Sequence, residues 1–343
     1  MEMDFENRIV TQEYTEQDSQ TDLSLRPKSF DEYIGQEKAK ENLSIYIEAS
    51  IKRGEPLDHT LLYGPPGLGK TTLAHVLANE MNSPCKVIQA PALEKKGDLA
   101  AILTNLEHGE FLFIDEIHRL PAAIEEMLYA AMEDRKLDIL IGQGPSAQTL
   151  KVDLRPFTLV GATTRAGLIS KPLHDRFGMS HRLEYYAQND LTVIAERSAR
   201  VLEVEMAPEG AKAIARRSRG TPRICNRLLR RCRDYAQVKG QGAITAEIAD
   251  ACLTLHEVDE LGLDSLDRAY LEALCIKFRG GPVGVRTLAA ALGEADGGAL
   301  EDLVEPFLMQ IGFLDRTQQG RKATDATYNY LGIKTGQGDL FGN

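Results

Sequence analysis

A glycine-rich loop that ends in Lys-Thr constrains this chain more than any other stretch. Residues 64–71 read Gly-Pro-Pro-Gly-Leu-Gly-Lys-Thr and fit the G-x-x-x-x-G-K-[ST] spacing of a phosphate-binding loop. In such a loop, backbone N–H groups turn toward the α- and β-phosphates of a nucleotide, Lys70 can reach the β- and γ-phosphates, and the Thr71 hydroxyl can ligate Mg²⁺. Apolar residues predict a strand over Thr60–Tyr63, and helical spacing predicts a helix over 72–81 that would aim its N-terminus at the phosphates. A chance glycine turn is the alternative, but it does not account for strand, loop and helix in this order.

Two carboxylates follow a second strand candidate. Four apolar residues, from Phe111 to Ile114, lead directly into Asp115 and Glu116. An apolar run of this length suits a buried parallel strand, and doubly wound sheets place their chemistry at the carboxyl ends of such strands. We therefore predict that Asp115 holds Mg²⁺, directly or through water, and that Glu116 polarises the attacking water beside the γ-phosphate. Two surface acids that end a strand are the alternative.

A third apolar strand candidate covers residues 157–164, and two arginines after it have the same predicted target. Thr164 is predicted to position the attacking water or to sense the γ-phosphate, although threonine is also an ordinary turn residue. Arg176 lies just beyond the sheet, where it would reach a γ-phosphate held by a neighbouring subunit, so it requires an oligomer. Arg223, at the start of a helix, would contact the γ-phosphate from within the same subunit. Solvated charges at helix ends are the alternative for both arginines.

The composition is that of a globular protein with uneven charge. The chain has 343 residues, of which 43% are hydrophobic and 27% charged, and its formal net charge is −11. The net charge argues against a nucleic-acid partner, but arginines crowd residues 216–233, so any DNA contact must be local. No apolar run approaches the roughly 18 residues of a membrane helix and the N-terminus does not resemble a signal peptide, so we expect a cytoplasmic protein. Five cysteines without C-x-x-C spacing favour reduced thiols, and no metal site made by the protein alone is expected.

The pattern of elements predicts an α/β fold with a parallel-sheet domain, a small helical lid and a C-terminal winged helix. The predicted boundaries are a flexible acidic tail over 1–24, the large domain over 25–186, the lid over 187–258 and the winged-helix domain over 259–343. Two strands around a glycine-rich turn predict a projecting hairpin over 137–154. The helices expected in the last two domains cover residues 191–202, 208–218, 222–238, 245–255, 265–277, 286–292 and 299–310.

The presence of a winged helix does not by itself decide whether this domain binds DNA or protein. Such modules bind DNA in many proteins and only protein in others. The expected recognition helix over 299–310 opens with Ala-Leu-Glu-Asp-Leu-Val-Glu-Pro, whose acids are unsuited to phosphates. The wing that follows offers Arg316, Arg321 and Lys322 instead. We therefore expect any DNA contacts at the wing rather than at this helix.

These motifs, taken in order, resemble those of AAA+ ATPases, and fuller stretches are similar to the RuvB family of Holliday-junction branch-migration motors. The resemblance covers residues 23–332. The AAA+ motifs are Leu25-Arg26-Pro27, Ile34-Gly35-Gln36, residues 64–71, Asp115-Glu116-Ile117-His118, Gly161-Ala162-Thr163-Thr164-Arg165, Asp175-Arg176-Phe177-Gly178 and Gly220-Thr221-Pro222-Arg223. The RuvB-like stretches are Leu57-Asp58-His59, residues 93–100, Ala131-Met132-Glu133-Asp134 and Gly280-Gly281-Pro282-Val283-Gly284.

The resemblance implies an ATP hydrolase that forms a hexameric ring on duplex DNA and drives branch migration of Holliday junctions together with RuvA. Homologous recombination, DNA repair and the SOS response to DNA damage would be its setting, RuvC resolvase a further partner, and ATP and Mg²⁺ its cofactors. Arg176 would be the arginine finger, and Lys70, Asp115, Glu116 and Thr164 would share in catalysis. The residues implied to contact the nucleotide are Leu25, Arg26, Gly67, Lys70, Thr71, Thr72, Glu133, Asp134, Arg135, Arg176, Tyr186 and Arg223.

Two further surfaces follow from the resemblance. RuvA would dock on the hairpin over 137–154, where Leu150 and Val152 stand two residues apart and share an apolar face. The wing residues Arg316 and Arg321 would touch DNA phosphates.

The sequence also departs from the family pattern. His174 stands where an arginine is usual, Arg135 where an aromatic residue is common, and Gln318-Gln319 replaces the usual Pro-Arg of the wing. Fewer wing charges predict a weaker grip on DNA. A clamp-loader-like switch that assembles a partner without moving DNA stays open, although the winged C-terminal domain argues against it. A DNA-binding module with a degenerate ATPase is disfavoured by the intact phosphate loop and acidic strand end.

Overall fold

The chain forms two compact units in the structure, a computed structural model. The sheet unit spans Glu16–Asp190, and the helical unit combines Met1–Thr15 with Leu191–Asn343. The residues that the structure describes are 8–11, 24–141, 148–294 and 297–333. Within these residues, no helix is long and apolar enough to cross a lipid bilayer.

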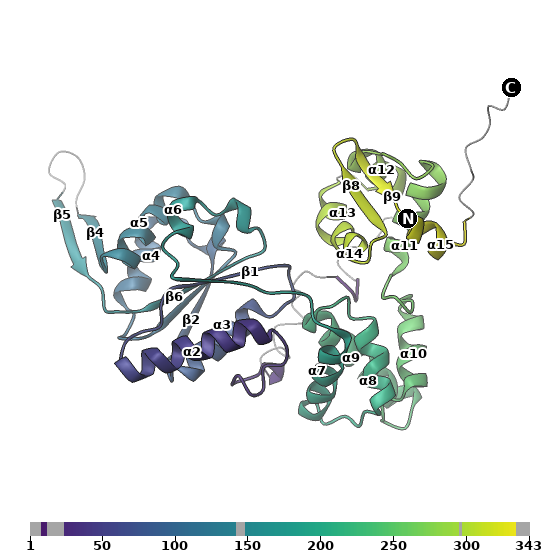
Figure 1. The fold of residues 1–343 in the computed structure, drawn as a ribbon, viewed down its shortest axis with the longest axis horizontal. Coiled ribbons are helices and arrows are strands. Elements are labelled where there is room, and N and C mark those ends of the chain that lie inside the picture. The colour runs from purple at the N-terminus through teal and green to yellow at the C-terminus, as the bar shows by residue number, and fades with distance from the viewer. Residues whose placement is uncertain (1–7, 12–23, 142–147, 295–296, 334–343) are drawn as a thin grey trace. The chain divides into compact units, whose positions relative to one another are not determined.

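A five-stranded parallel sheet forms the centre of the sheet unit (Figure 1). Its strands are β1 (Thr60–Tyr63), β2 (Cys85–Gln89), β3 (Phe111–Asp115), β6 (Thr158–Thr163) and β7 (Met179–Arg182). In the order β2-β3-β6-β1-β7, the three inner strands are almost wholly buried, as their apolar runs predict. Strand β7 was not predicted because it is a polar edge strand, in which Met179 is the one buried residue.

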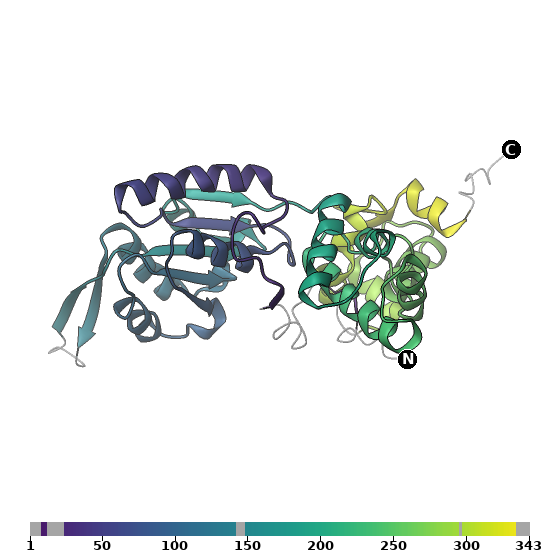
Figure 2. The same cartoon turned by 90° about the horizontal axis from the view of Figure 1, so that it is seen from below.

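Helices cover both faces of this sheet (Figures 1 and 2). They are α2 (Glu37–Arg53), α3 (Lys70–Glu80), α4 (Lys96–Thr104), α5 (Ala122–Glu133) and the short α6 (Lys171–His174). On one face, Leu103 of α4 and Leu128 of α5 belong to the same buried cluster as Leu112 and Leu159 of the sheet. Helices α2 and α3 lie on the other face. The predicted α/β fold with a parallel sheet is therefore confirmed.

A two-stranded hairpin, separate from the central sheet, follows α5 within the sheet unit. Its strands are β4 (Lys136–Ile141) and β5 (Gln148–Asp153), which pair antiparallel with Leu137 opposite Val152 and Ile139 opposite Leu150. The hairpin predicted over 137–154 is thus present, although its turn at residues 142–147 lies outside the described residues. Leu150 is exposed on it.

The first part of the helical unit is a lid of four helices, as predicted. They are α7 (Gln188–Val201), α8 (Pro208–Arg216), α9 (Pro222–Lys239) and α10 (Ala246–Leu255). The hydroxyls of Thr221 and Thr245 cap α9 and α10 by accepting the N–H groups of Ile224 and Ile248. Several arginines of the basic stretch are not on the surface, because Arg217, Arg219, Arg227 and Arg230 are buried. This stretch is therefore no continuous basic patch for DNA.

The second part is the winged helix. It contains α11 (Ser265–Glu272), a π-helical turn over Ala273–Lys277, α12 (Val285–Leu292), α13 (Gly298–Leu303), α14 (Glu305–Gln310), the wing strands β8 (Leu314–Thr317) and β9 (Gly320–Ala323), and α15 (Asp325–Leu331). The single helix expected over 299–310 is wrong, because the chain breaks into α13 and α14 at Val304. Pro306 explains the break, since it has no N–H to continue the helical hydrogen bonds.

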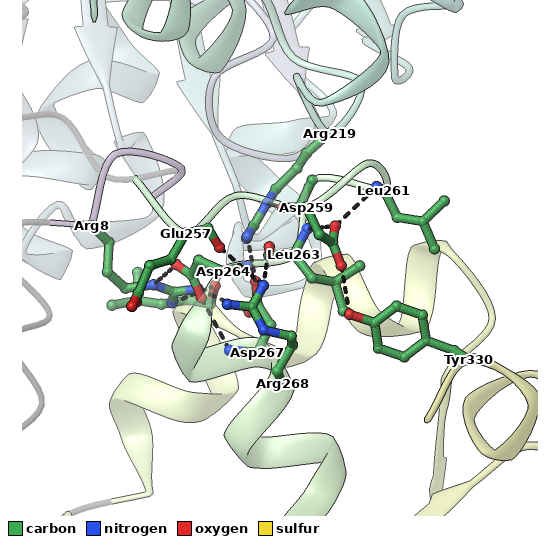
Figure 3. Close-up of polar contacts among 12 residues, drawn as sticks. Arg8, Arg219, Glu257, Asp259, Leu261, Leu263, Asp264, Asp267, Arg268 and Tyr330 are labelled. Atoms are coloured by element: carbon green, nitrogen blue, oxygen red, sulfur yellow. Dashed lines mark hydrogen bonds and ion pairs between the residues drawn. The ribbon is translucent and has the colours of Figure 1, made fainter. Parts of the chain in front are cut away.

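A buried ionic cluster joins the N-terminal segment to the start of the winged helix (Figure 3). Arg8 donates from Nε to Asp264 at 2.6 Å and from Nη2 to Asp264 and Asp267 at 3.0 and 2.8 Å. Arg219 of the lid forms an ion pair with the same Asp267, and its guanidinium lies 4.4 Å from the ring centroid of Phe307. The two aspartates also form the capping box that begins α11. Lid, winged helix and N-terminal segment therefore share one polar core.

Residues 8–11 thus differ from the flexible tail predicted over 1–24. Val10 is fully buried, and Arg227 of α9 donates to the carbonyl oxygen of Thr11 at 2.8 Å. Local composition in this acidic stretch gave no sign of these contacts, which arise from residues more than 200 positions away. The remainder of the predicted tail up to residue 23 lies outside the described residues.

Candidate active site

The phosphate loop connects β1 to α3 in a conformation that requires glycine. Gly64 has a φ of 144°, and a Cβ there would lie 2.5 Å from the carbonyl oxygen of Leu183. Gly69, with a φ of 88°, is the N-cap residue of α3. Both angles belong to the region that glycine alone adopts readily. The loop backbone therefore curls tightly before an 11-residue helix whose N-terminus favours anions.

Lys70 begins α3 and points back into this loop. Its Nζ donates to the carbonyl oxygens of Gly64 and Pro65 at 2.8 and 2.9 Å, and the residue is only 7% exposed. Oxygen acceptors already surround the ammonium group, so phosphate oxygens can join or replace them. Thr71 and Thr72 follow in the first turn of the same helix, both half-buried. A tight backbone cradle with a buried ammonium group fits the phosphates of a nucleotide.

Glu116 and Thr164 meet beside the loop. Strand β6 lies between β1 and β3, so the carboxyl ends of these three strands share one edge of the sheet. There the Thr164 hydroxyl donates to the two carboxylate oxygens of Glu116 at 3.1 and 3.3 Å. Asp115 ends β3 and accepts from the side-chain amide of Gln89 at 3.3 Å. The structure thus brings the predicted Glu116 and Thr164 into direct contact.

His118 belongs to this cluster and was not singled out from the sequence. Its Nδ1 lies 3.1 Å from Glu116 and 2.9 Å from the hydroxyl of Thr163. Burial lowers the pKa of His118, the charges of Arg165 and Arg119 lower it further, and Glu116 opposes both. The lowered pKa favours the neutral imidazole, which lies in contact with the Glu116 carboxylate. The available signal was the Asp-Glu-x-His spacing, since the tight turn over Ile117–Arg119 returns the histidine to Glu116.

Tyr186 lies against the back of the phosphate loop. Its hydroxyl is 3.3 Å from that of Tyr33 and donates to the carbonyl oxygen of Leu68 at 3.4 Å. A Cβ on Gly35 would lie 2.7 Å from the Tyr186 ring, so glycine at 35 makes room for it. Burial raises the pKa of Tyr186 to about 12, which keeps the phenol neutral. Tyr33 is a further member of this site that sequence reasoning missed.

The predicted adenine-side residues lie near the same helix. Leu25 is 3% exposed and Arg26 half-buried. Burial lowers the pKa of His75 on α3, and the positive charge of Arg26 lowers it further. Their contact with a base stays a prediction.

Arg176 is held by side chains of α5 and by the backbone of the residues just before Arg176 itself. Its Nη2 donates to Glu133 at 2.9 Å, its Nη1 donates to the carbonyl oxygen of Pro172 at 2.8 Å, and its guanidinium carbon lies 4.6 Å from the ring centroid of Tyr129. The structure thus brings together two predicted residues, Arg176 and Glu133. A role as arginine finger stays a prediction.

The other predicted residues of this stretch follow Glu133 at the end of α5. Asp134 and Arg135 are exposed, and Arg135 has a left-handed φ of 53° where the chain turns into β4. Arg223 is half-buried at the start of α9 in the helical unit. Nucleotide contacts from all three stay predictions.

The two wing arginines differ in surroundings. Arg316 is half-exposed, with Nη2 donating to Glu301 at 2.9 Å. Arg321 has a side chain only 9% exposed, and it pairs with Glu305 at 2.8 Å and with Glu301. Tyr270 completes this buried group by donating to Glu305 at 3.0 Å. DNA contact stays a prediction for both arginines, but only Arg316 offers an accessible guanidinium here.

The fold and this site define a P-loop ATPase that carries a helical lid and a winged helix on one chain. Three family models match in succession: the P-loop domain of the Holliday junction DNA helicase RuvB over residues 25–183, the RuvB AAA lid domain over 186–259, and the RuvB C-terminal winged helix domain over 260–332. The chain belongs to the RuvB family.

Solved structures agree with this assignment. One described as the Thermotoga maritima RuvB Holliday junction branch migration motor is 48% identical, has a TM-score of 0.81, and the match covers 91% of this chain and 99% of that chain. Two single-substitution variants of Thermotoga maritima RuvB give 48% identity with a TM-score of 0.81 and 47% with 0.80, each covering 90% of this chain and 99% of theirs. The resemblance predicted from the motifs is therefore confirmed, as is ATP hydrolase activity as the enzyme class.

Proposed function

We propose that this protein is an ATP-driven DNA motor that drives branch migration of Holliday junctions as a hexameric ring with RuvA. The supporting observation is the contact between Glu116 and Thr164 beside an intact phosphate loop, on a chain that ends in a winged helix. A degenerate ATPase would have no reason to retain this contact. Recombination and repair of damaged DNA in the cytoplasm, with RuvC resolvase as a further partner, complete the proposal.

The nucleotide would be held by the cradle described above. Lys70 and the loop backbone bind the β- and γ-phosphates, Gly67, Thr71 and Thr72 add contacts, and the remaining proposed contacts come from Leu25, Arg26, Tyr186 and Arg223. Thr71 and Asp115 would hold Mg²⁺, which supplies charge neutralisation at the phosphate oxygens when bound. Glu116 orients the attacking water and accepts its proton, while Thr164 and His118 keep the carboxylate directed.

Arg176 is the reason to expect a ring. In the proposal it neutralises charge on the γ-phosphate held by the neighbouring subunit, which ties hydrolysis to assembly. Glu133 ends α5 and contacts Arg176, and Asp134 and Arg135 follow it directly, so this stretch would approach that nucleotide too.

Two surfaces complete the motor. The wing would contact DNA phosphates through Arg316, and through Arg321 only if its ion pairs with Glu301 and Glu305 open. RuvA would dock on the hairpin, where Leu150 is exposed and Val152 half-buried on one face.

Dissociation of a synthetic four-way DNA junction tests the proposal directly. The protein is assayed with ATP and Mg²⁺, with and without RuvA, and with Lys70→Ala as the matched inactive control. We expect RuvA-stimulated separation into duplex arms that the control does not give. Hydrolysis of ATP with the junction intact, even in the presence of functional RuvA, would instead support the clamp-loader-like switch.

A further inference from the structure

One face of α5 carries three side chains that converge on Arg176 and on the segment before it. Glu125, Tyr129 and Glu133 follow one another at intervals of four residues, so they form one stripe along the helix. The guanidinium of Arg176 lies over the middle member of this stripe, 4.6 Å from the Tyr129 ring centroid. Its Nη2 donates to the last member, Glu133, at 2.9 Å.

The first member of the stripe fixes both the ring and the chain. The hydroxyls of Tyr129 and Ser170 both donate to the Glu125 carboxylate, and the two hydroxyl oxygens are 3.0 Å apart. Ser170 is the N-cap residue of α6 and accepts the N–H of Leu173 at 3.3 Å. The segment that ends at Arg176 is therefore attached to α5 at its beginning as well as at its end.

The donors of Arg176 divide into fixed and exchangeable ones. Nη1 donates to the Pro172 carbonyl at 2.8 Å, and Nε is buried with no hydrogen-bond partner among the residues the structure describes. Nη2 alone pairs with a carboxylate, and Glu133 is 63% exposed. An exposed pair of this kind contributes little, so a phosphate can take the place of Glu133. The stacking on Tyr129 does not have to change when it does.

We propose that Tyr129 is a positioning residue that holds the plane of the Arg176 guanidinium so that its outer edge is ready for a phosphate. In the separate subunit Glu133 occupies that edge, and in the assembly the γ-phosphate of a neighbouring subunit's ATP replaces it. This rests on the proposed role of Arg176 in trans. The Tyr129 ring restricts the rotation of the long Arg176 side chain. Without the ring, that side chain would have to be ordered when the phosphate binds.

Steady-state ATP hydrolysis by the full-length protein, assembled on duplex DNA with Mg²⁺, tests the proposal. Tyr129→Leu removes the ring, whereas Tyr129→Phe keeps it and loses only the hydroxyl. We expect Tyr129→Leu to lower kcat by about 10- to 100-fold, the range for a misplaced catalytic group, with little change in KM. Tyr129→Phe should lose far less, because the ring that stacks on the guanidinium stays although its hydroxyl contact with Glu125 is lost. Tyr46→Leu, at an exposed tyrosine of α2, is the matched control, and its kcat should equal that of the unaltered protein.

Mixed assemblies separate positioning from damage to the fold. A Tyr129→Leu subunit keeps its own phosphate loop, and a Lys70→Ala subunit keeps an intact Arg176 and Tyr129. Mixing the two should therefore give more hydrolysis than the sum of the separate activities, because each supplies what the other lacks. A mixture no more active than that sum overturns the proposal, since a merely structural loss is not rescued in trans.

Arg176→Ala distinguishes this proposal from the function on which it rests. If Arg176→Ala loses activity and adding Tyr129→Leu to it causes no further loss, the two residues act as one unit. If Arg176→Ala is inactive but Tyr129→Leu is fully active, only the positioning role fails. Full activity of Arg176→Ala in the assembly would refute the trans arginine itself.

Discussion

Two arginine–carboxylate groups in this protein use the same chemistry in opposite ways. The pair of Arg176 and Glu133 in the sheet unit is partly exposed, with side-chain exposures of 29% and 63%. The cluster of Arg8, Arg219, Asp264 and Asp267 in the helical unit is at most 8% exposed (Figure 3). Breaking an exposed ion pair costs little free energy, whereas removing one member of a buried ionic group leaves an uncompensated charge.

The difference teaches where function and stability reside. Arg176 keeps one edge exchangeable, which suits a residue that must bind a ligand. At the buried cluster each aspartate serves a guanidinium and a helix cap at once, so little capacity is left for a ligand. Exposure of the carboxylate partner, rather than the presence of an ion pair, separates the two roles. Changes in the first group should alter catalysis alone, and changes in the second should alter stability.

The largest effect is expected for Arg176→Ala. Loss of a trans arginine lowers kcat by about 10³- to 10⁵-fold in other nucleotide hydrolases, and we expect a fall in this range. The free energy of unfolding should fall by no more than about 2 kcal/mol, because the ion pair, the stacking on Tyr129 and the bond to the Pro172 carbonyl are all partly exposed contacts. Single-turnover hydrolysis in the assembled state and urea unfolding by circular dichroism measure the two quantities. A large loss of stability would contradict the comparison.

Arg8→Ala should instead lower the free energy of unfolding and leave the chemistry of the nucleotide site intact. Removing one member of a buried ionic group costs about 3 to 5 kcal/mol, because Asp264 then loses the guanidinium bonded to it and Asp267 keeps only Arg219. Hydrogen exchange at the N–H groups of α11 reports this local loss directly. The matched control is Arg53→Ala, whose ion pair with Glu55 is more than half exposed and should cost at most about 1 kcal/mol. Equal effects of the two substitutions would show that Arg8 contributes no more than a surface charge.

The same contrast explains how far the sequence could be interpreted. Lys70, Glu116 and Thr164 lie at strand ends and in a short loop, so local spacing predicted their assembly. The partners of Arg8 are 256 residues away in the chain, and no local pattern marks them. His118 belonged to a quoted motif but was given no role, because its contact with Glu116 depends on the tight turn over Ile117–Arg119. The edge strand β7 was missed because polar residues dominate it. The break at Val304 was missed because the apolar spacing continues across it, although Pro306 was the local signal for it.

Acid should weaken the buried cluster within a defined range of pH. Burial alone would raise the pKa of Asp264, but the Arg8 guanidinium outweighs it and lowers that pKa to about 2. A carboxyl with a lowered pKa stabilises the folded state above its unfolded value near 3.9, and this contribution disappears as the pH falls to about 2. Burial raises the pKa of Asp267 in the same cluster, so its protonation opposes this loss, and we expect a net loss of at most about 2 kcal/mol between pH 4 and pH 2. Urea unfolding across this range should show the loss in the unaltered protein and a flatter profile in Asp264→Asn.

The wing repeats the comparison within a single hairpin, where the substitution of the exposed Arg316 is expected to have the smallest effect. Arg316→Ala should leave stability unchanged, because its pair with Glu301 is half-exposed. Duplex DNA binding should weaken, and the slope of log affinity against log salt should fall by about one unit, the loss of one phosphate contact. Arg321→Ala should instead destabilise the winged helix, because Glu305 is fully buried against it. Fluorescence anisotropy of labelled duplex over a salt series measures this slope. An unchanged slope for Arg316→Ala would remove this residue from the DNA interface.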